Sequence, residues 1–443
     1  MRKILTFFVL FFVANSLFAQ NTWDGTTITP VTHSKNIYTI TNGAELAWIA
    51  QQCNNGSLDF KVSTVSIAED IDLGNHEWTP IGTEEFPFLG NCQGNDKVIS
   101  NLRITGTNDN VGLFGFMQSY NTRTTLRVSN VLLENVNIKG GKHVGGLIGY
   151  AEHCAFDSCY VLTGTVEGSE AVGGFVGRTL YTACSDCFSN VKVTATTNYG
   201  GGFVGVNDTS DGMKLIVTYC FAKGSVSGPG TNGGFVGLNN SKVKSAYTVT
   251  NPISGATFGG FCGENTKLGK FENCYFCTSF NSSIQGIGDN KGTVDVDLDM
   301  LGSTNVQMMQ DGFVGTGSGN GLNGSDYGKI HWSPDLKTPQ TPANERHPIP
   351  LWYYILKYDS TASINTLSNT SISIYPNPVK NELFLKLENI HVDKVEIVDL
   401  LGKPVIIPTH IAEMVDVSQL NKGIYFVKIY SNDKIHTRKF IKQ

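Results

Sequence analysis

The sequence predicts an all-β chain: a parallel β-solenoid (β-helix) of about six glycine-aromatic repeats with caps, followed by a small Ig-like β-sandwich. Three observations lead to this fold class. A glycine-rich hexapeptide recurs at regular spacing, residues 372–443 alternate apolar and polar side chains, and the chain has 49 glycines among 443 residues with only 16% charged residues. Such a composition is typical of many short strands joined by tight turns.

Length and charge narrow the class of protein further. A chain of 443 residues exceeds one ordinary domain and indicates two or three structural units. The formal net charge is −5, so the chain lacks the basic surface that neutralises nucleic-acid phosphates. Nucleic acid is therefore excluded as an expected partner.

The hexapeptide is the strongest signal in the middle of the chain. Its copies are NVGLFG (110–115), VGGLIG (144–149), VGGFVG (172–177), GGGFVG (200–205), NGGFVG (232–237) and FGGFCG (258–263). Their final glycines lie 34, 28, 28, 32 and 26 residues apart, a period that suits one solenoid coil per repeat. Since glycine allows close approach of neighbouring backbones, a structural role is predicted for Gly149, Gly177, Gly205, Gly237 and Gly263.

Two further sets of residues, each of which we call a register, recur at the same spacing as the hexapeptide. SCY (158–160), DCF (186–188), YCF (219–221), SAY (245–247) and NCY (273–275) each follow one copy. Asn207, Asn239 and Asn265 each stand two residues after a final glycine, and stacked asparagines can hydrogen-bond along a ladder of coils.

The cysteine register has three interpretations. Its members are Cys159, Cys187, Cys220 and Cys274, and Ala246 occupies the remaining place. Because alanine fits the same position, inward packing of a small side chain is the leading interpretation. Disulfides in an exported chain and a zinc site are the alternatives.

These repeats resemble the GLUG motif of bacterial surface and secreted proteins, which include adhesins and immunoglobulin A peptidases. The resemblance covers most of residues 23–355, with flanking segments such as AEDIDLGNHEWTPIG (68–82) and HPIPLWY (347–353). It implies an N-terminal cap region at 20–104, repeats at 105–290 and a C-terminal cap at 291–358. Within the first cap, Asn42 and Glu45 form a capping-box-like start, which predicts a short helix.

The N-terminal end has the anatomy of a signal peptide over residues 1–19. A positive start, Met1 to Lys3, precedes a mainly apolar run too short to span a membrane. Cleavage is expected between Ala19 and Gln20, with retention as an anchor as the alternative. No other stretch is long and apolar enough to predict a transmembrane segment.

The C-terminal strands carry a second resemblance. SIYPNP (373–378), VEIVDLLGKPV (395–405), VDVSQLNKGIYFVKI (415–429) and RKFIKQ (438–443) closely resemble, in this order, the type IX secretion (Por secretion system) C-terminal sorting domain. The motif residues are Tyr375, Pro376, Asn377, Pro378, Gly402, Gly423 and Tyr425. An ordinary Ig-like accessory module at 372–443 is the alternative.

The sorting-domain resemblance implies a destination and two partners. The domain would be read by the type IX translocon and removed by a sortase-like peptidase. Cleavage would fall in the linker at 359–371, which is rich in Ser, Thr and Asn. The remainder would be secreted or attached to the outer cell surface.

Other motifs yield no catalytic, cofactor-binding or metal-ligating residue. Asp295, Asp297 and Asp299 alternate in a DVDLD run that could attract calcium, but Met300 replaces the EF-hand glycine, so a solvated turn is preferred. GNGLNG (319–324) matches GxGxxG without the strand and helix that a dinucleotide site requires.

The leading functional interpretation is an adhesin-like binding protein that is displayed on the cell surface or released. Its ligand would be a glycan, a host protein or a surface protein. The alternative is a polysaccharide lyase or hydrolase, because β-helices can place carboxylates on neighbouring coils. Asp157, Asp186 and Glu272 lie near the cysteine register at different offsets, which weakens that alternative. A structural surface spacer is the third interpretation.

Overall fold

The protein forms two structural units. The structure is a computed structural model that describes residues 22–119, 125–209, 216–292, 300–303, 332–333, 349–350, 371–375, 379–388, 394–398, 404–406, 414–431 and 434–442. The units are Met1–Trp352 and Tyr353–Gln443. The proposed signal peptide with Ala19 and Gln20, the DVDLD run and GNGLNG therefore lie outside the described residues.

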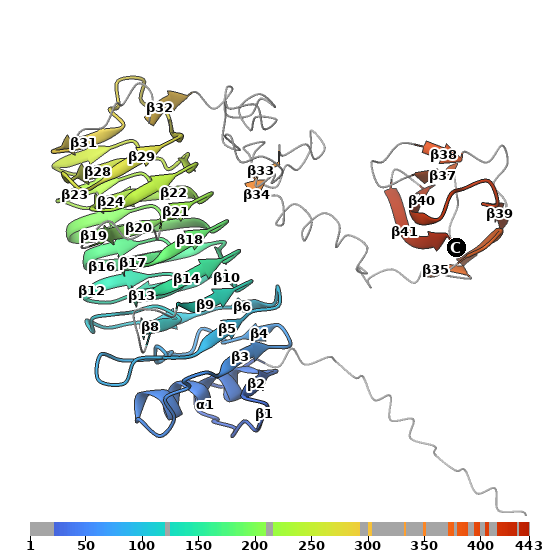
Figure 1. Ribbon diagram of the computed structural model, residues 1–443, viewed down its shortest axis with the longest axis horizontal. Coiled ribbons are helices and arrows are strands. Elements are labelled where there is room, and N and C mark those ends of the chain that lie inside the picture. The colour runs from blue at the N-terminus through green and yellow to red at the C-terminus, as the bar shows by residue number, and fades with distance from the viewer. Residues whose placement is uncertain are drawn as a thin grey trace, which may run out of the picture. The chain divides into compact units, whose positions relative to one another are not determined.

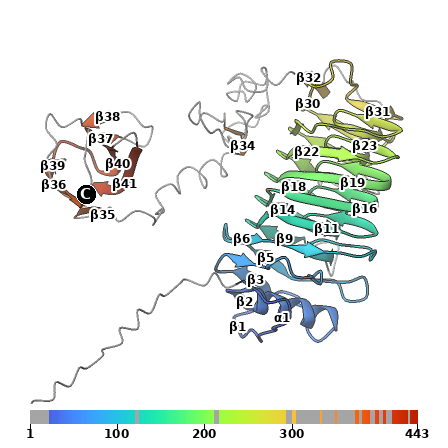
Figure 2. The same ribbon diagram turned by 180° about the vertical axis from the view of Figure 1, so that it is seen from behind.

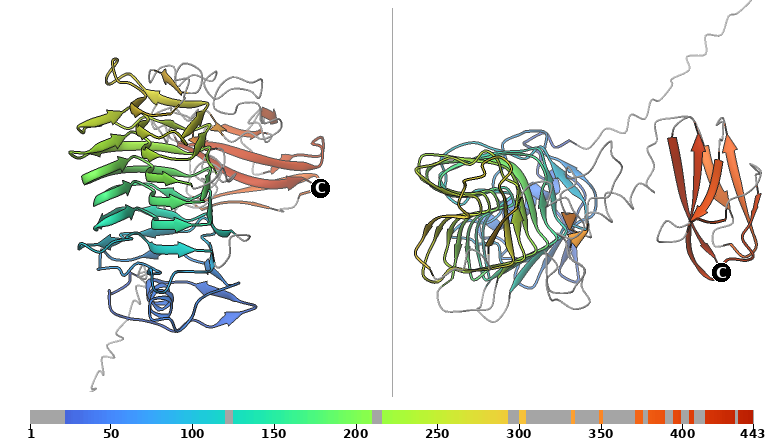
Figure 3. Two further views of the ribbon diagram at one scale, coloured as in Figure 1. Left: turned by 60° about the vertical axis from the view of Figure 1, so that its left-hand side comes forward. Right: turned by 90° about the horizontal axis from the view of Figure 1, so that it is seen from above.

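The first unit is a parallel β-solenoid, as predicted, and its strands form three sheets (Figures 1 and 2). In the view from above, the coils of the solenoid are superposed (Figure 3, right). The seven-stranded sheet consists of β8 (Phe114–Gln118), β13 (Ile148–Glu152), β17 (Val176–Leu180), β20 (Val204–Asp208), β24 (Val236–Asn239), β28 (Cys262–Asn265) and β31 (Ile287–Asn290). The ten-stranded sheet consists of β1 (His33–Ser34), β2 (Ile37–Ile40), β3 (Thr64–Ile67), β5 (Asn91–Gln93), β9 (Leu126–Ser129), β14 (Cys154–Asp157), β18 (Ala183–Ser185), β21 (Val217–Thr218), β25 (Lys242–Lys244) and β29 (Lys270–Glu272).

The third sheet has fifteen strands. Its main path consists of β4 (Ile71–Asp72), β6 (Val98–Ser100), β10 (Leu132–Glu134), β15 (Tyr160–Val161), β19 (Phe188–Gly201), β22 (Phe221–Ser227), β26 (Tyr247–Thr248), β30 (Cys274–Cys277) and β32 (Met300–Ser303). Beside this path lie β7 (Arg103–Ile104), β11 (Val136–Lys139), β12 (Lys142–Gly145), β16 (Gly164–Gly173), β23 (Thr231–Gly233) and β27 (Thr257–Gly259). A separate antiparallel pair is β33 (Trp332–Ser333) with β34 (Ile349–Pro350).

Parallel stacking starts before the first hexapeptide. β2, β3 and β5 already pair in parallel and lie within residues 20–104, the region for which the sequence predicts a cap. The predicted helix is present as α1 (Gly43–Asn54), and the Asn42 side chain accepts a hydrogen bond from the Glu45 amide at 3.0 Å. The apolar face of α1 includes Leu46 and Ile49, which pack into the solenoid core. The N-terminal region therefore combines a helix with further coils.

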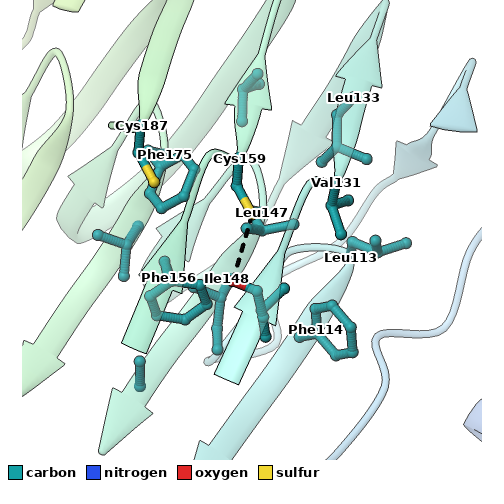
Figure 4. Close-up of a cluster of buried hydrophobic side chains, with 14 of the residues drawn as sticks. Leu113, Phe114, Val131, Leu133, Leu147, Ile148, Phe156, Cys159, Phe175 and Cys187 are labelled. Carbon is teal, nitrogen blue, oxygen red and sulfur yellow. Dashed lines mark hydrogen bonds between the residues drawn. The ribbon is translucent and has the colours of Figure 1, made fainter. Parts of the chain in front are cut away.

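The interior holds a continuous apolar core (Figure 4). Phe175, Phe203, Phe235 and Phe261, the aromatic residues of four hexapeptides, stack with ring centroids 4.8, 5.0 and 4.8 Å apart. The double glycines allow this spacing, because a Cβ built on Gly174 would lie 2.2 Å from the Gly202 carbonyl oxygen. Sequence periodicity is thus converted directly into coil spacing.

The second unit is a small antiparallel β-sandwich. One sheet consists of β35 (Ser371–Tyr375), β36 (Glu382–Glu388) and β39 (Met414–Asp416), and the other of β37 (Lys394–Val398), β38 (Pro404–Ile406), β40 (Gly423–Ser431) and β41 (Lys434–Lys442). Among the described residues of this unit, ten buried side chains, including Leu383, Ile397, Val427 and Phe440, form its core. The alternation of apolar residues in the sequence matches this arrangement.

Candidate functional site

The cysteine register lies at a corner of the solenoid. Each member follows a residue with a left-handed backbone, where φ is between 49° and 55°; these corner residues are Ser158, Asp186, Tyr219, Ser245 and Asn273. Cys159, Cys187, Cys220 and Cys274 are 0% exposed, as is Ala246, and all belong to the apolar core. Figure 4 shows the Cys159 and Cys187 sulfurs among core side chains. All ten cysteines are buried thiols and none forms a disulfide. Burial raises the pKa of Cys159 and Cys187, which disfavours the reactive thiolate.

The asparagine register forms a hydrogen-bonded ladder inside the solenoid. Asn207 Nδ2 donates to Asn239 Oδ1 at 2.9 Å, and Asn239 Nδ2 donates to Asn265 Oδ1 at 3.1 Å. Asn265 continues to Asn290 at 3.0 Å, and Thr179 donates to Asn207 at 3.0 Å. The ladder extends the three-asparagine register by one residue at each end. Thr179, Asn207, Asn239 and Asn265 are buried, whereas Asn290 is exposed, so the ladder has a structural role inside the solenoid.

The five final glycines lie in strands of the seven-stranded sheet. A Cβ added to Gly149, Gly177, Gly205, Gly237 or Gly263 would lie between 2.3 and 2.6 Å from a backbone atom of a neighbouring coil. These five glycines therefore serve to hold neighbouring coils close together rather than to hold a ligand.

The described part of the solenoid contains a groove near its N-terminal end. We call it the N-terminal groove: it has a volume of about 500 Å³ and is lined by parts of residues 77–84 and 104–111 with Asn54 and Lys139. A second hollow of about 380 Å³ adjoins it and shares Asn54, Glu77, Trp78 and Thr79. Volumes of a few hundred Å³ are typical of small-molecule binding sites.

Hydrogen bonds hold the walls of the groove in place. Asn54, at the end of α1, accepts from the Gly82 amide at 2.8 Å and donates to the Pro80 carbonyl at 2.8 Å. The Trp78 indole donates to the Leu113 carbonyl at 3.2 Å, so its ring is fixed in the core rather than free as a sugar platform. The groove is preformed, which lowers the entropic cost of binding.

Three carboxylates and one lysine line the groove, and each carboxylate accepts a hydrogen bond from a neighbouring segment. Glu77 accepts from the Thr105 amide at 2.6 Å, Glu84 from Asn110 Nδ2 at 2.8 Å, and Asp109 from the Lys142 amide at 2.7 Å. Lys139 pairs with Glu167 at 2.8 Å and Glu77 pairs with Arg103 at 3.6 Å, and the three carboxylates outnumber the one lysine in the lining. Glu77 and Glu84 lie in the segment between β4 and β5, and Asp109 lies in the segment between β7 and β8, so no sequence motif signalled that the three would meet.

A polar and aromatic row leads away from the groove along the coils. His143 Nδ1 lies 2.8 Å from Asn110 Oδ1, and the His143 ring is 5.3 Å from that of Tyr150. The Arg178 guanidinium lies 5.5 Å from the Tyr150 ring centroid and pairs with Asp208 at 2.8 Å. Burial, assisted by Arg178, holds the pKa of His143 below its usual value. The row presents one neutral imidazole, one phenol and one cation beside the groove.

The acidic residues weighed from the sequence do not meet in one cluster. Glu272 pairs with Lys242 and Lys244, at 2.5 and 3.0 Å, while Asp186 accepts a hydrogen bond from Ser185. Among the described residues, no group of three or more His, Cys, Asp or Glu side chains has an arrangement that could hold a metal ion. The described part of the chain also contains no helix long and apolar enough to cross a membrane.

The predicted sorting-domain residues fall partly within the β-sandwich. Gly423 starts β40, and Tyr425 donates to the Asn421 carbonyl at 3.1 Å while its ring lies 5.7 Å from that of Phe440. Tyr375 ends β35. Pro376, Asn377, Pro378 and Gly402 lie outside the described residues.

Comparison with known families assigns the second unit. Residues 373–443 match the family described as secretion system C-terminal sorting domain. A search for similar sequences among curated proteins finds no match. The chain is therefore a β-solenoid protein exported by type IX secretion, whose C-terminal domain interacts with the secretion machinery. Such proteins are secreted or attached to the outer cell surface.

Proposed function

We propose that the solenoid is an adhesin-like binding module that the sorting domain delivers to the cell surface or the medium, and that the N-terminal groove is its ligand site. The preformed groove is the observation that carries the proposal. Regular coils hold its walls, so binding requires little rearrangement. The resemblance of the repeats to the GLUG motif of surface proteins supports the same role.

The chemistry of the groove favours a hydroxyl-rich ligand without acidic groups. Thr79, Thr83 and Thr105 contribute hydroxyl or backbone groups beside the carboxylates. Carboxylate oxygens accept hydrogen bonds from sugar hydroxyls, whereas they repel a uronic or sialic acid. A neutral sugar or an amino sugar is therefore the proposed ligand class.

The export route is inferred to include two cleavages. A signal peptide over residues 1–19 would be removed between Ala19 and Gln20, and a sortase-like peptidase would cut within residues 359–371. Mass spectrometry of the protein recovered from the medium or the cell surface would give both new termini. Recovery of an intact C-terminus would contradict the second cleavage.

Binding is tested with the full chain on an array of neutral, amino and acidic glycans. Thr79 is exposed and lines both hollows, so Thr79→Arg fills the groove without removing a wall contact. Thr197→Arg, at an exposed position in β19, is the matched control. We expect binding of neutral or amino glycans to fall at least tenfold for Thr79→Arg and to be unchanged for the control. Equal binding by both variants would contradict the groove as the site.

A lyase or hydrolase is the second candidate, favoured by the three carboxylates in one groove. The array ligands are incubated with the chain and analysed for new reducing ends or unsaturated products. If the chain cleaves them, Asp109→Asn would abolish product formation while Thr197→Arg retains it. A folded chain that neither binds nor cleaves any tested ligand would instead favour a structural spacer.

A further inference from the structure

Four lysines gather at the C-terminal end of the ten-stranded sheet. They lie in β25 or in and just before β29, and they are Lys242, Lys244, Lys267 and Lys270. The residues that alternate with them in the two strands, Val243 and Phe271, are buried in the core, so the strand lysines face outward. We call residues 242–244 and 267–272 the lysine face.

The lysine face is positive although the whole chain has a net charge of −5. Its residues include four lysines and one glutamate, a local net charge of +3. The single carboxylate, Glu272, is shared by Lys242 at 2.5 Å and Lys244 at 3.0 Å. Lys267 and Lys270 are exposed, and neither forms an ion pair with another described residue. The face therefore carries more positive charge than its own acidic group can neutralise.

Strand pairing holds two of these cations close together. Lys242 lies directly opposite Lys270 in the parallel pair of β25 with β29. Neighbouring strands are about 4.8 Å apart, so the two lysines start from adjacent positions and their ammonium groups repel each other. An anion that lies across both strands would remove this repulsion.

The surface beside the lysines is flat. In the preceding strands, Thr218 lies opposite Lys244 and Ser185 lies opposite Thr218. These small side chains do not obstruct a ligand that extends along the sheet. Small molecules prefer concave sites, whereas a flat row of cations suits an extended chain of anionic groups.

We propose that the lysine face binds an acidic polysaccharide, a polymer that carries sulfate or carboxylate groups along its length. The chain is exported, so this face meets polymers outside the cell. A lipid surface fits less well, because Leu268 is the single exposed large apolar side chain of the face and membrane affinity grows with buried apolar area. The lysine face and the N-terminal groove share no residue, so the proposal does not rest on ligand binding in the groove.

Binding of the full chain to immobilised dextran sulfate tests the proposal, with uncharged dextran as the matched polymer. We expect binding to dextran sulfate alone, and its affinity should fall as the salt concentration rises from about 50 to about 300 mM. The double variant Lys267→Glu with Lys270→Glu should bind about tenfold more weakly. The control, Lys35→Glu with Lys192→Glu, alters two exposed lysines elsewhere and changes the net charge by the same amount. Its affinity should change by less than about twofold.

A milder variant and two further probes complete the test. Lys267→Gln with Lys270→Gln removes the charges without reversing them, so it should lose affinity by a smaller factor; circular dichroism checks that each variant is folded. Equal losses in the lysine-face variant and the control would show that only net charge matters and would overturn the proposal. Failure of the unchanged chain to bind dextran sulfate would overturn it as well. Tighter binding to phosphatidylglycerol vesicles or to single-stranded DNA than to dextran sulfate would assign the face to a different class of partner.

Discussion

Replacing Asn239 by leucine tests whether the asparagine ladder stabilises the solenoid. Asn239 is 0% exposed, and its side chain both accepts from Asn207 and donates to Asn265. Leucine has a similar volume but no polar atoms, so the Asn207 Nδ2 donor and the Asn265 Oδ1 acceptor would lose these partners. Each buried group left without a partner costs about 1 to 3 kcal/mol, which gives a loss of about 2 to 6 kcal/mol. That is a large part of the stability of a typical domain.

The assay is chemical denaturation of the full chain, followed by tryptophan fluorescence and by circular dichroism. Repeat proteins can unfold in more than one step, so the transition that includes β24 is compared between variants. Asn137→Leu is the control, because Asn137 is exposed on β11, and it should change stability by less than about 0.5 kcal/mol. A loss below about 1 kcal/mol for Asn239→Leu would refute the reasoning.

A double variant refines the same test. In Asn207→Leu with Asn239→Leu, the two partners of one hydrogen bond disappear together, so neither leaves the other orphaned at that contact. The combined loss should therefore be smaller than the sum of the two single losses. Additive losses would show that the asparagines act separately rather than as a ladder.

Three further predictions concern packing, pH and thiol chemistry. Gly174→Ala should lower the free energy of unfolding by about 1 to 3 kcal/mol, because the added Cβ would lie 2.2 Å from the Gly202 carbonyl oxygen. Thermal unfolding measures the loss. The control is Gly423→Ala, whose Cβ would meet no atom closer than 3.6 Å. Burial keeps the folded-state pKa of His143 below 6.5, so the contribution of the neutral imidazole to stability is intact above pH 6.5 and is lost as the pH falls through the folded-state pKa. In His143→Gln, the free energy of unfolding should therefore depend less on pH over that range. The ten buried thiols should react with a thiol reagent only after denaturation.

Each of these three predictions would be contradicted by a specific result. Similar melting temperatures for the two glycine variants would mean that the coils can separate locally at no cost. An unchanged pH profile in the histidine variant would assign the acid sensitivity to other groups. Rapid modification of several thiols in the native chain would show that the corner register opens to solvent.

The repeat registers made most of the fold predictable. Each coil reuses the same small set of contacts, so the spacing of Gly177 and Gly205 or of Asn207 and Asn239 reports the coil length and the face on which a residue lies. The start of the solenoid was harder to read, because β2, β3 and β5 carry no hexapeptide and stack on backbone pairing with varied side chains.

The amino-acid sequence by itself determined the solenoid class, the helix start at Asn42, the asparagine ladder and the sorting domain. These features depend on residues close in sequence or repeated at a fixed period, so local rules reach them. Only the tertiary structure decided that the cysteines remain buried thiols and that Glu77, Glu84 and Asp109 share one groove. The winding of the solenoid brings Asp109 beside the segment that contains Glu77 and Glu84, and this contact between non-repeated segments leaves no periodic pattern in the sequence.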